Sequence, residues 1–489
     1  MTQRLSGILM HPTALPGQHG IGDIGAEAYN FIDNLSEMGQ SLWQILPLGP
    51  TDIYNSPYSS ISTFAGNHLL ISLDLLVEDD LLSANSLEDY NSNDEETINF
   101  NEVIKYKLSI LEEVSKNFGS KASKKIQNSF NKFCIENSFW LDDYSQYWAL
   151  KKENDLTSWI QWRQKSVSCP HYIYEAKIMQ FLFHYQWERL QKYCHSKGVQ
   201  IIGDMPIYVG YDSADVFYNK ELFQLDGAGE MLWQSGCPPC EFQEDGQLWG
   251  APLYNWKNHE EQNFDWWKKR FKKLFGMVDI IRLDHFIGYA HYYRIPMNEE
   301  TAKNGQWINA PGEKLFKELI VENQNFRVIA EDLGSVTKEV INLRNRFKFP
   351  GMRVLQFELD PVPHKGSFDQ NSIVCTGTHD NDTIMGWYSM LPYESKNRTI
   401  LTKKKLLEIF NCKENNIHWE IIKFAFSTGS NMIVIPIQDL LGEGTCARFN
   451  EPGVISSKNW SWRMKDEKLT NEIKNNLFQI TKNYMYLNN

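Results

Sequence analysis

The sequence lacks the features of several easily recognised classes of protein. Basic residues are not in excess, since 49 Lys and Arg stand against 61 Asp and Glu, a formal net charge of −12. That balance, without any basic run, disfavours nucleic acid and anionic membranes as partners. No apolar stretch approaches the roughly 18 residues of a membrane span, and the N-terminal residues show no signal peptide. We therefore expect a cytoplasmic protein without a membrane partner.

The eight cysteines also lack the spacing of a disulfide framework. Only Cys237 and Cys240 are close together, in the sequence Cys-Pro-Pro-Cys. This pair could form a redox switch or half of a tetrahedral metal site, but no matching second pair exists. Two ordinary thiols in a loop are the simpler interpretation. An internal repeat is absent as well.

Aromatic residues, in contrast, are abundant: 16 Trp, 22 Tyr and 27 Phe in 489 residues. Hydrophobic content of 42% and charged content of 22% are typical of a globular protein with a full core. A chain of this length suits two or three ordinary domains, or one barrel with large insertions. Many aromatic side chains must fill the core, but exposed rings also hold the apolar faces of sugars.

Short apolar runs alternate with helical patterns along much of the chain. The runs expected to be strands are residues 7–10, 41–46, 199–205, 278–283, 326–330, 352–357, 372–376 and 431–436. The first two, with the helical pattern between them, form a βαβ unit. Eight such runs predict an α/β protein with one (β/α)8 barrel, the TIM-barrel fold.

Two insertions interrupt the predicted barrel, one after its second strand and one after its third. Residues about 51–173 have mainly helical patterns, whereas residues about 207–262 are rich in Gly, Pro and Trp and are expected to be irregular. The barrel would then comprise about 1–50, 174–206 and 263–489. We expect a single catalytic unit without a separate C-terminal β domain.

The stretch 278–293, VDIIRLDHFIGYAHYY, is the centre of the predicted site. Its apolar run ends in Arg282, Asp284 and His285. Residues two positions apart project from the same face of a strand, so the guanidinium of Arg282 would keep the Asp284 carboxylate ionised. A charged carboxylate at the C-terminal end of a barrel strand suits a nucleophile. A buried Arg–Asp pair that only braces the barrel would have the same pattern.

Further acidic residues follow other predicted strands: Asp204 the third, Glu331 the fifth and Asp380 the seventh. Because the C-terminal ends of barrel strands share one face, these residues should converge with Asp284. Such a set suits a metal site, or glycoside cleavage by a pair of carboxylates. The permanent charge of Arg282 disfavours a divalent cation, and the loop aromatics favour sugars. A metal site and a non-catalytic sugar-binding barrel stay open.

A series of ordered motifs runs along nearly the whole chain. They are HPTALPGQHGIGDIG at 11–25, WQILPLGPT at 43–51, SPY at 56–58, FAGN at 64–67, GDMPIYV at 203–209, DSADVF at 212–217, GQLWGAPLYNW at 246–256, RLDHF at 282–286, AEDLG at 330–334, GTHDNDT at 377–383, QDLLG at 438–442 and NWSWR at 459–463. In these motifs the chain resembles the 4-α-glucanotransferase (amylomaltase) family, glycoside hydrolase family 77 of the α-amylase superfamily. The helical region 69–162 carries little of the resemblance.

The resemblance implies that Asp284 is the nucleophile, Glu331 the general acid/base, and Asp380 the carboxylate that holds hydroxyls of the distorted donor sugar. The substrate-binding positions would be Tyr58, Asp204, Gln247, Trp249, Arg282, His285, His379, Asn450 and Phe242. The implied reaction moves an α-1,4-glucan segment from a maltodextrin to the 4-hydroxyl of glucose or another maltodextrin, with retention of configuration. It requires no metal and no other cofactor. The alternatives are an α-1,4-glucan hydrolase and a non-catalytic glucan-binding barrel.

The chain departs from the family pattern in three places. Cys240 and Gln243 stand where the family usually has Asp and Ser, with Phe242 kept between them. Residues 52–55 are bulkier than the usual glycine-rich turn, and Val454 replaces a usual Thr. We expect these changes to affect acceptor preference and loop mobility. A lid carrying Phe242 would help an acceptor reach the intermediate before water, unless that ring only packs the loop.

Overall fold

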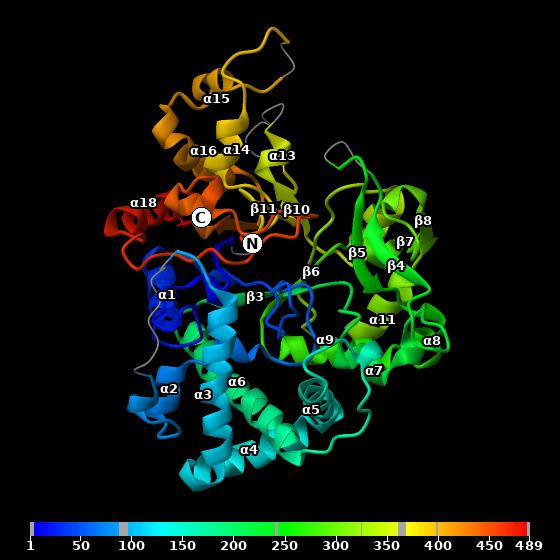
Figure 1. Ribbon diagram of the computed structural model, residues 1–489. Coiled ribbons are helices and arrows are strands. Elements are labelled where there is room, and N and C mark those ends of the chain that lie inside the picture. Colours follow the sequence, from blue (N-terminus) through cyan, green and yellow to red (C-terminus); the bar gives the residue numbers. More distant parts are fainter. Residues whose placement is uncertain are drawn as a thin grey trace.

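The computed structural model describes residues 4–87, 96–239, 243–323, 325–359, 368–397 and 400–486. Cys240 and Phe242 lie outside this range. Figure 1 shows the arrangement of the described chain: a central barrel, a block of helices on one side, and a separate antiparallel sheet on another. Each part contributes a wall or a support to the site described below.

Eight parallel strands close the barrel, in the order β1-β12-β11-β10-β9-β6-β3-β2, and confirm the predicted fold. They are β1 (Leu5–Leu9), β2 (Leu42–Gln44), β3 (Gln200–Met205), β6 (Ile280–Leu283), β9 (Val328–Ala330), β10 (Gly351–Val354), β11 (Ser372–Cys375) and β12 (Met432–Pro436). Every predicted strand overlaps one of these. Strands β6 and β9 are buried throughout, as continuous apolar runs in a parallel barrel should be.

One predicted strand is wrong in its second half. The run 352–357 was expected to be extended, but β10 ends at Val354 and α13 (Leu355–Glu358) follows at once. An apolar run of this length does not separate strand from helix by periodicity alone. Phe357, apolar but 55% exposed, lies at the cleft rather than in the core.

Helices surround the barrel and cover its outer face. Those that follow or precede barrel strands are α1 (Ala26–Glu37), α6 (Pro170–Ser196), α9 (Asp265–Phe275), α10 (Ile287–Ala290), α11 (Gly312–Glu322), α12 (Lys338–Arg346), α14 (Ile384–Met390), α15 (Lys403–Phe410), α16 (Ile417–Ser427), α17 (Ile437–Leu441) and α18 (Asn471–Thr481). No helix among the described residues combines the length and apolar character needed to cross a membrane.

The first insertion is helical, as expected. It contains α2 (Leu73–Glu78), α3 (Phe100–Lys121), α4 (Lys124–Glu136) and α5 (Ser138–Glu153), which gather beside α6 in Figure 1. Two fully buried amides of α6 hold the loop after β2. Gln180 bonds both backbone groups of Gly66, at 2.7 and 2.9 Å, and Gln186 bonds both of Ser72, at 2.8 and 2.9 Å. The loop that carries Tyr58 is therefore anchored at its far end.

The second insertion is more regular than its composition indicated. Within it, α7 (Ala214–Tyr218) and α8 (Trp256–Glu261) flank β4 (Trp233–Cys237) and β5 (Gln247–Pro252). These strands join β7 (His291–Pro296) and β8 (Gln306–Asn309) in an antiparallel sheet of order β5-β4-β7-β8. The expectation of an irregular insertion is thus incomplete, and strands β7 and β8 after the fourth barrel strand were missed. The pairing of β7 with β4 is long-range, since Trp233 pairs with Pro296.

Candidate active site

A cleft of about 2000 Å³ opens at the C-terminal ends of the barrel strands. The predicted site residues that line it are Tyr58, Gln247, Trp249, Arg282, Asp284, His285, Glu331, His379, Asp380 and Asn450. Asp204 is buried behind them, with 3% of its surface exposed. The structure therefore brings together all the predicted site residues that it describes. Phe242 is the exception, since it lies outside the described residues.

Asp284 and Glu331 leave the barrel side by side. Leu283 at the end of β6 and Ala330 at the end of β9 are register partners, and each carboxylate residue is the next in its chain. The backbone N–H of Glu331 donates to the carbonyl of Leu283 at 3.1 Å, which continues the pairing. Adjacent strands are about 4.8 Å apart, so the two acids start from neighbouring positions.

Arg282 forms two ion pairs at the base of the cleft. Its Nη1 lies 3.0 Å from Oδ1 of Asp284 and 2.7 Å from Oδ2 of Asp204. The predicted same-face contact between Arg282 and Asp284 is thereby confirmed. Asp204 joins them because it is the register partner of Arg282 on β3. A buried guanidinium stays charged at any working pH and supplies a fixed positive charge beside the Asp284 carboxylate.

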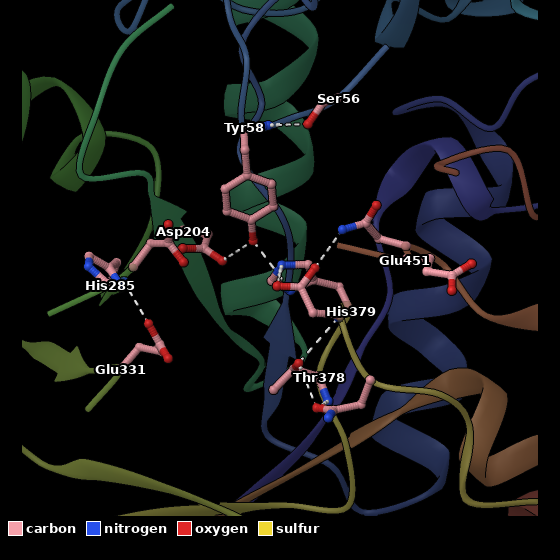
Figure 2. Close-up of polar contacts among 12 residues, drawn as sticks. Ser56, Tyr58, Asp204, His285, Glu331, Thr378, His379 and Glu451 are labelled. Atoms are coloured by element: carbon pink, nitrogen blue, oxygen red, sulfur yellow. Dashed lines mark hydrogen bonds and ion pairs between the residues drawn. The ribbon is translucent and has the colours of Figure 1, made fainter. Parts of the chain in front are cut away.

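Tyr58 connects two sides of the site. Its hydroxyl donates to Oδ2 of Asp204 at 2.7 Å and lies 3.3 Å from Nδ1 of His379, as Figure 2 shows. The Tyr58 and His379 rings also stack, with centroids 4.7 Å apart. Within its own loop, the Tyr58 N–H donates to Oγ of Ser56 at 3.2 Å. One side chain therefore links the loop after β2 to the ends of β3 and β11.

Asp380 is held as an anion. Asn450 donates to Oδ1 at 2.6 Å, and Nε2 of His379 lies 3.3 Å from Oδ2. Burial acts to raise the pKa of Asp380, but the contacts with His379 and Asn450 outweigh it and lower the pKa to about 2. The carboxylate is charged throughout the physiological pH range.

Glu331 has the opposite character. Burial raises its pKa to about 8, and Arg282 opposes this only in part, so the group carries a proton at pH 7. It accepts one hydrogen bond, at 2.6 Å, from the backbone N–H of His285 (Figure 2). His285 has a φ of 45°, in the left-handed region that is unfavourable for a residue with a side chain. That backbone turn aims the N–H at Glu331.

The antiparallel sheet adds Trp249 and Gln247 to the site. The Trp249 indole N–H donates to Oε1 of Gln247 at 2.8 Å, and its ring packs edge-on against His285 with centroids 4.8 Å apart. Burial lowers the pKa of His285 to about 4, so its imidazole is neutral at pH 7. These residues form an uncharged wall on the side of Glu331.

Sequence reasoning missed two supporting residues. Trp460 is buried and has a φ of 65°. Its ring lies against those of Tyr58 and His379, with centroid distances of 5.8 and 6.0 Å. Arg448 donates to the backbone carbonyls of Asp380 and Asn450 at 2.8 and 2.7 Å. Trp460 belongs to the NWSWR motif, which was a signal without an assigned role. Arg448 had no signal, because its acceptors are backbone atoms.

The described residues contain no group of three or more His, Cys, Asp or Glu arranged to hold a metal ion. Asp204 and Asp284, the candidates for such a set, both contact Arg282, whose charge would oppose a divalent cation. Cys237 lies on β4, and Cys240 lies outside the described residues.

Comparison with known proteins agrees with this geometry. A family model described as 4-alpha-glucanotransferase matches residues 10–470. The 4-alpha-glucanotransferase of Clostridium butyricum is 40% identical over 496 residues, covering 97% of this chain and 99% of that protein. The protein of the same name from Synechocystis is 38% identical and covers 99% and 98%. The solved amylomaltase from Streptococcus agalactiae, in complex with acarbose, superposes with a TM-score of 0.93 at 34% identity, covering 99% of each chain.

The family model spans most of the sequence, the relatives align end to end, and the barrel places the acidic residues of the shared motifs around one cleft. The chain therefore belongs to the 4-alpha-glucanotransferase (amylomaltase) family, with 4-alpha-glucanotransferase activity on α-1,4-glucans.

Proposed function

We propose that Asp284 and Glu331 catalyse the transfer by a retaining double displacement. In the first half, the Asp284 carboxylate attacks the anomeric carbon of the donor glucan. The glycosidic bond breaks, Glu331 gives its proton to the departing oxygen, and a shortened sugar leaves. The donor segment is then held as a glycosyl ester on Asp284.

In the second half, the 4-hydroxyl of an acceptor attacks the same carbon. Its proton passes to Glu331, the ester bond to Asp284 breaks, and an α-1,4 bond forms again. We propose glucose and other maltodextrins as acceptors. The relative from Streptococcus agalactiae is solved in complex with acarbose, which supports the cleft of this chain as the binding site for α-1,4-glucans.

The observation that carries this assignment is the contrast between the two neighbouring acids. Asp284 has the fixed positive charge of Arg282 at 3.0 Å. Glu331 is protonated at pH 7 because burial raises its pKa to about 8. A carboxylate paired with a fixed cation, next to a protonated carboxylic acid, suits the roles of nucleophile and general acid.

The remaining site residues divide into two sides. We propose that Asp380, with its charge held by His379 and Asn450, bonds hydroxyls of the donor ring. The donor side comprises Tyr58, Asp204, Arg282, His379, Asp380 and Asn450, and the leaving-group and acceptor side comprises Gln247, Trp249, His285 and Phe242. The Trp249 ring offers an apolar face to a sugar on that second side.

We further propose that the barrel and its two insertions act as a single catalytic unit. The same cleft is lined by Tyr58 from the first insertion, Trp249 from the second and Asp284 from the barrel. This shared lining supports a single unit. The scattered cysteines support a cytoplasmic location.

Incubation with maltotriose tests the proposed function. We expect glucose together with a ladder of longer maltodextrins, as separated by thin-layer chromatography. Products that are all shorter than maltotriose would indicate a hydrolase, and unchanged maltotriose would indicate a binding protein. EDTA should leave the ladder intact, because no step uses a metal ion.

A further inference from the structure

Trp307 on β8 lines the same cleft as Asp284 and Glu331, yet the mechanism above does not use it. Its side chain is 40% exposed, a large apolar surface to leave in contact with water. The loop immediately after Glu331, through Leu333, Gly334 and Ser335, lines the cleft together with it.

The indole of Trp307 is held in place by its neighbours. Tyr293 on β7 is its register partner, so the two side chains share a face of the sheet. The rings of Tyr293 and His291 both pack against the indole in T-shaped arrangements. Their centroids lie 5.1 and 4.9 Å from that of Trp307. Both neighbours are buried, and the Tyr293 hydroxyl donates to the carbonyl of Ala302 at 2.9 Å. The ring is therefore a supported platform rather than a free surface side chain.

Trp233 on the same sheet provides a contrast. It is half-buried, and the guanidinium of Arg294 lies over its ring, 4.3 Å from the centroid. Trp233 does not line the cleft. Its ring face is already occupied by a cation–π contact, whereas Trp307 presents apolar surface to the cleft.

The chemistry decides which part of a substrate can reach Trp307. Glu331 protonates the oxygen between the donor ring and the leaving sugar, so leaving and acceptor sugars lie on the Glu331 side, away from Asp380. On that side, Trp249 occupies the β5 edge of the antiparallel sheet and Trp307 the β8 edge. The edges are three strand spacings apart, about 14 Å. A single acceptor sugar beside Glu331 cannot span this distance.

We propose that Trp307 forms a remote acceptor subsite, where its ring stacks against a sugar several units along an α-1,4-glucan acceptor. This inference rests on the proposed function, because it uses the acid/base role of Glu331 to define the acceptor side. It makes a long maltodextrin a better acceptor than glucose. The catalytic steps themselves are unchanged.

The test separates acceptor binding from donor binding. The donor is a maltosyl fluoride whose non-reducing 4-hydroxyl is blocked, so that it cannot also act as acceptor. Rates of transfer are measured with glucose and with maltohexaose as acceptors. For Trp307→Ala we expect the KM for maltohexaose to rise about 3- to 10-fold, the usual scale of one aromatic contact. kcat/KM for glucose should stay within about twofold, because glucose does not reach the platform.

Three further variants complete the test. Trp307→Leu keeps an apolar contact with Tyr293 but lacks a flat ring, so it should show the same selective loss even if the alanine variant folds poorly. Trp307→Phe should retain most of the preference. Trp233→Ala, the control on the same sheet, should leave both acceptors unaffected.

The proposal is overturned by an unchanged KM for maltohexaose, by equal losses with both acceptors, or by the same selective loss in Trp233→Ala. A wild-type enzyme that transfers to neither acceptor would instead overturn the proposed function, and this inference with it.

Discussion

The two sides of the cleft use carboxyl groups in contrasting environments. On the proposed donor side, Asp380 contacts the side chains of both Asn450 and His379, and its pKa falls to about 2. On the acid/base side, Glu331 accepts one backbone N–H, from His285, and burial raises its pKa to about 8. Both groups lie in the same cleft, so burial alone does not set their charge. The positive and hydrogen-bonding partners outweigh burial at Asp380 but offset it only in part at Glu331.

One cleft thus holds both a charged carboxylate, Asp380, and an acid that is protonated at pH 7, Glu331. A charged Asp380 suits the hydroxyl binding proposed for it, and a protonated Glu331 suits the proposed acid/base role. Variants on the two sides test the proposed roles in turn, beginning with Asp284, the proposed nucleophile.

The largest effect is expected for Asp284→Asn. The amide keeps the size of the side chain but cannot form the glycosyl ester, so turnover should fall on the order of 10⁴-fold or more. Glucan binding, measured by calorimetry, should survive. Residual transfer within about tenfold of wild type would mean that another carboxylate is the nucleophile.

Glu331→Gln should remove the acid without affecting the donor side. With maltotriose the rate should fall about 10²- to 10⁴-fold, because the leaving sugar needs a proton. Formation of the glycosyl-enzyme from a maltosyl fluoride should be much less affected, since fluoride leaves without one. Fluoride release measures that step directly. An equally large loss with the fluoride would contradict the acid role.

Tyr58→Phe should weaken the donor side. It removes the hydroxyl that donates to Asp204 at 2.7 Å but keeps the ring that stacks on His379. A hydrogen bond to a charged group contributes about 1.5–3 kcal/mol, so kcat/KM should fall about 10- to 100-fold. Tyr54→Phe is the matched control, because Tyr54 is 55% exposed at the rim of the same cleft. A comparable loss in the control would show that Tyr58 has no special role.

The pH profile should report the acid/base side alone. The pKa of Glu331 is raised, so its proton is present at neutral pH and is lost as the pH rises through about 8. The kcat/KM for maltotriose should therefore be halved near pH 8 and fall about tenfold for each further unit. The fluoride donor should lack this limb in glycosyl-enzyme formation. An alkaline limb of the same midpoint in Glu331→Gln would assign it to a different group.

The smallest effect is expected for Phe242→Ala, at the residue proposed to act on the acceptor side. The neighbouring Gln243 donates from Nε2 to the carbonyl of Pro452 at 3.2 Å, which connects its loop to the loop after Asn450. If Phe242 helps to exclude water there, the ratio of transfer to hydrolysis should fall a few-fold while glycosyl-enzyme formation is unchanged. Free glucose measured against the maltodextrin ladder gives this ratio. An unchanged ratio would mean that Phe242 only packs the loop.

Much of the fold and the chemistry was predictable because the signals are local. The apolar runs of the eight barrel strands and the helical patterns between them lie within short windows. The ends of parallel barrel strands must share one face, so acids placed just after strands, such as Asp284 and Glu331, had to converge. The contact between Arg282 and Asp284 followed from their spacing of two residues.

Other features depended on contacts between distant residues, and only the tertiary structure decided them. The hydroxyl of Tyr58 reaches Asp204 across 146 residues, and β4 meets β7 through a pairing that no short window contains. Glu331 is protonated because it is buried. The Trp307 ring is held in place by two rings on the neighbouring strand. The sequence by itself determined which acids stand at the ends of the barrel strands. Folding decided how each acid is charged, because a pKa depends on the groups and the solvent around it.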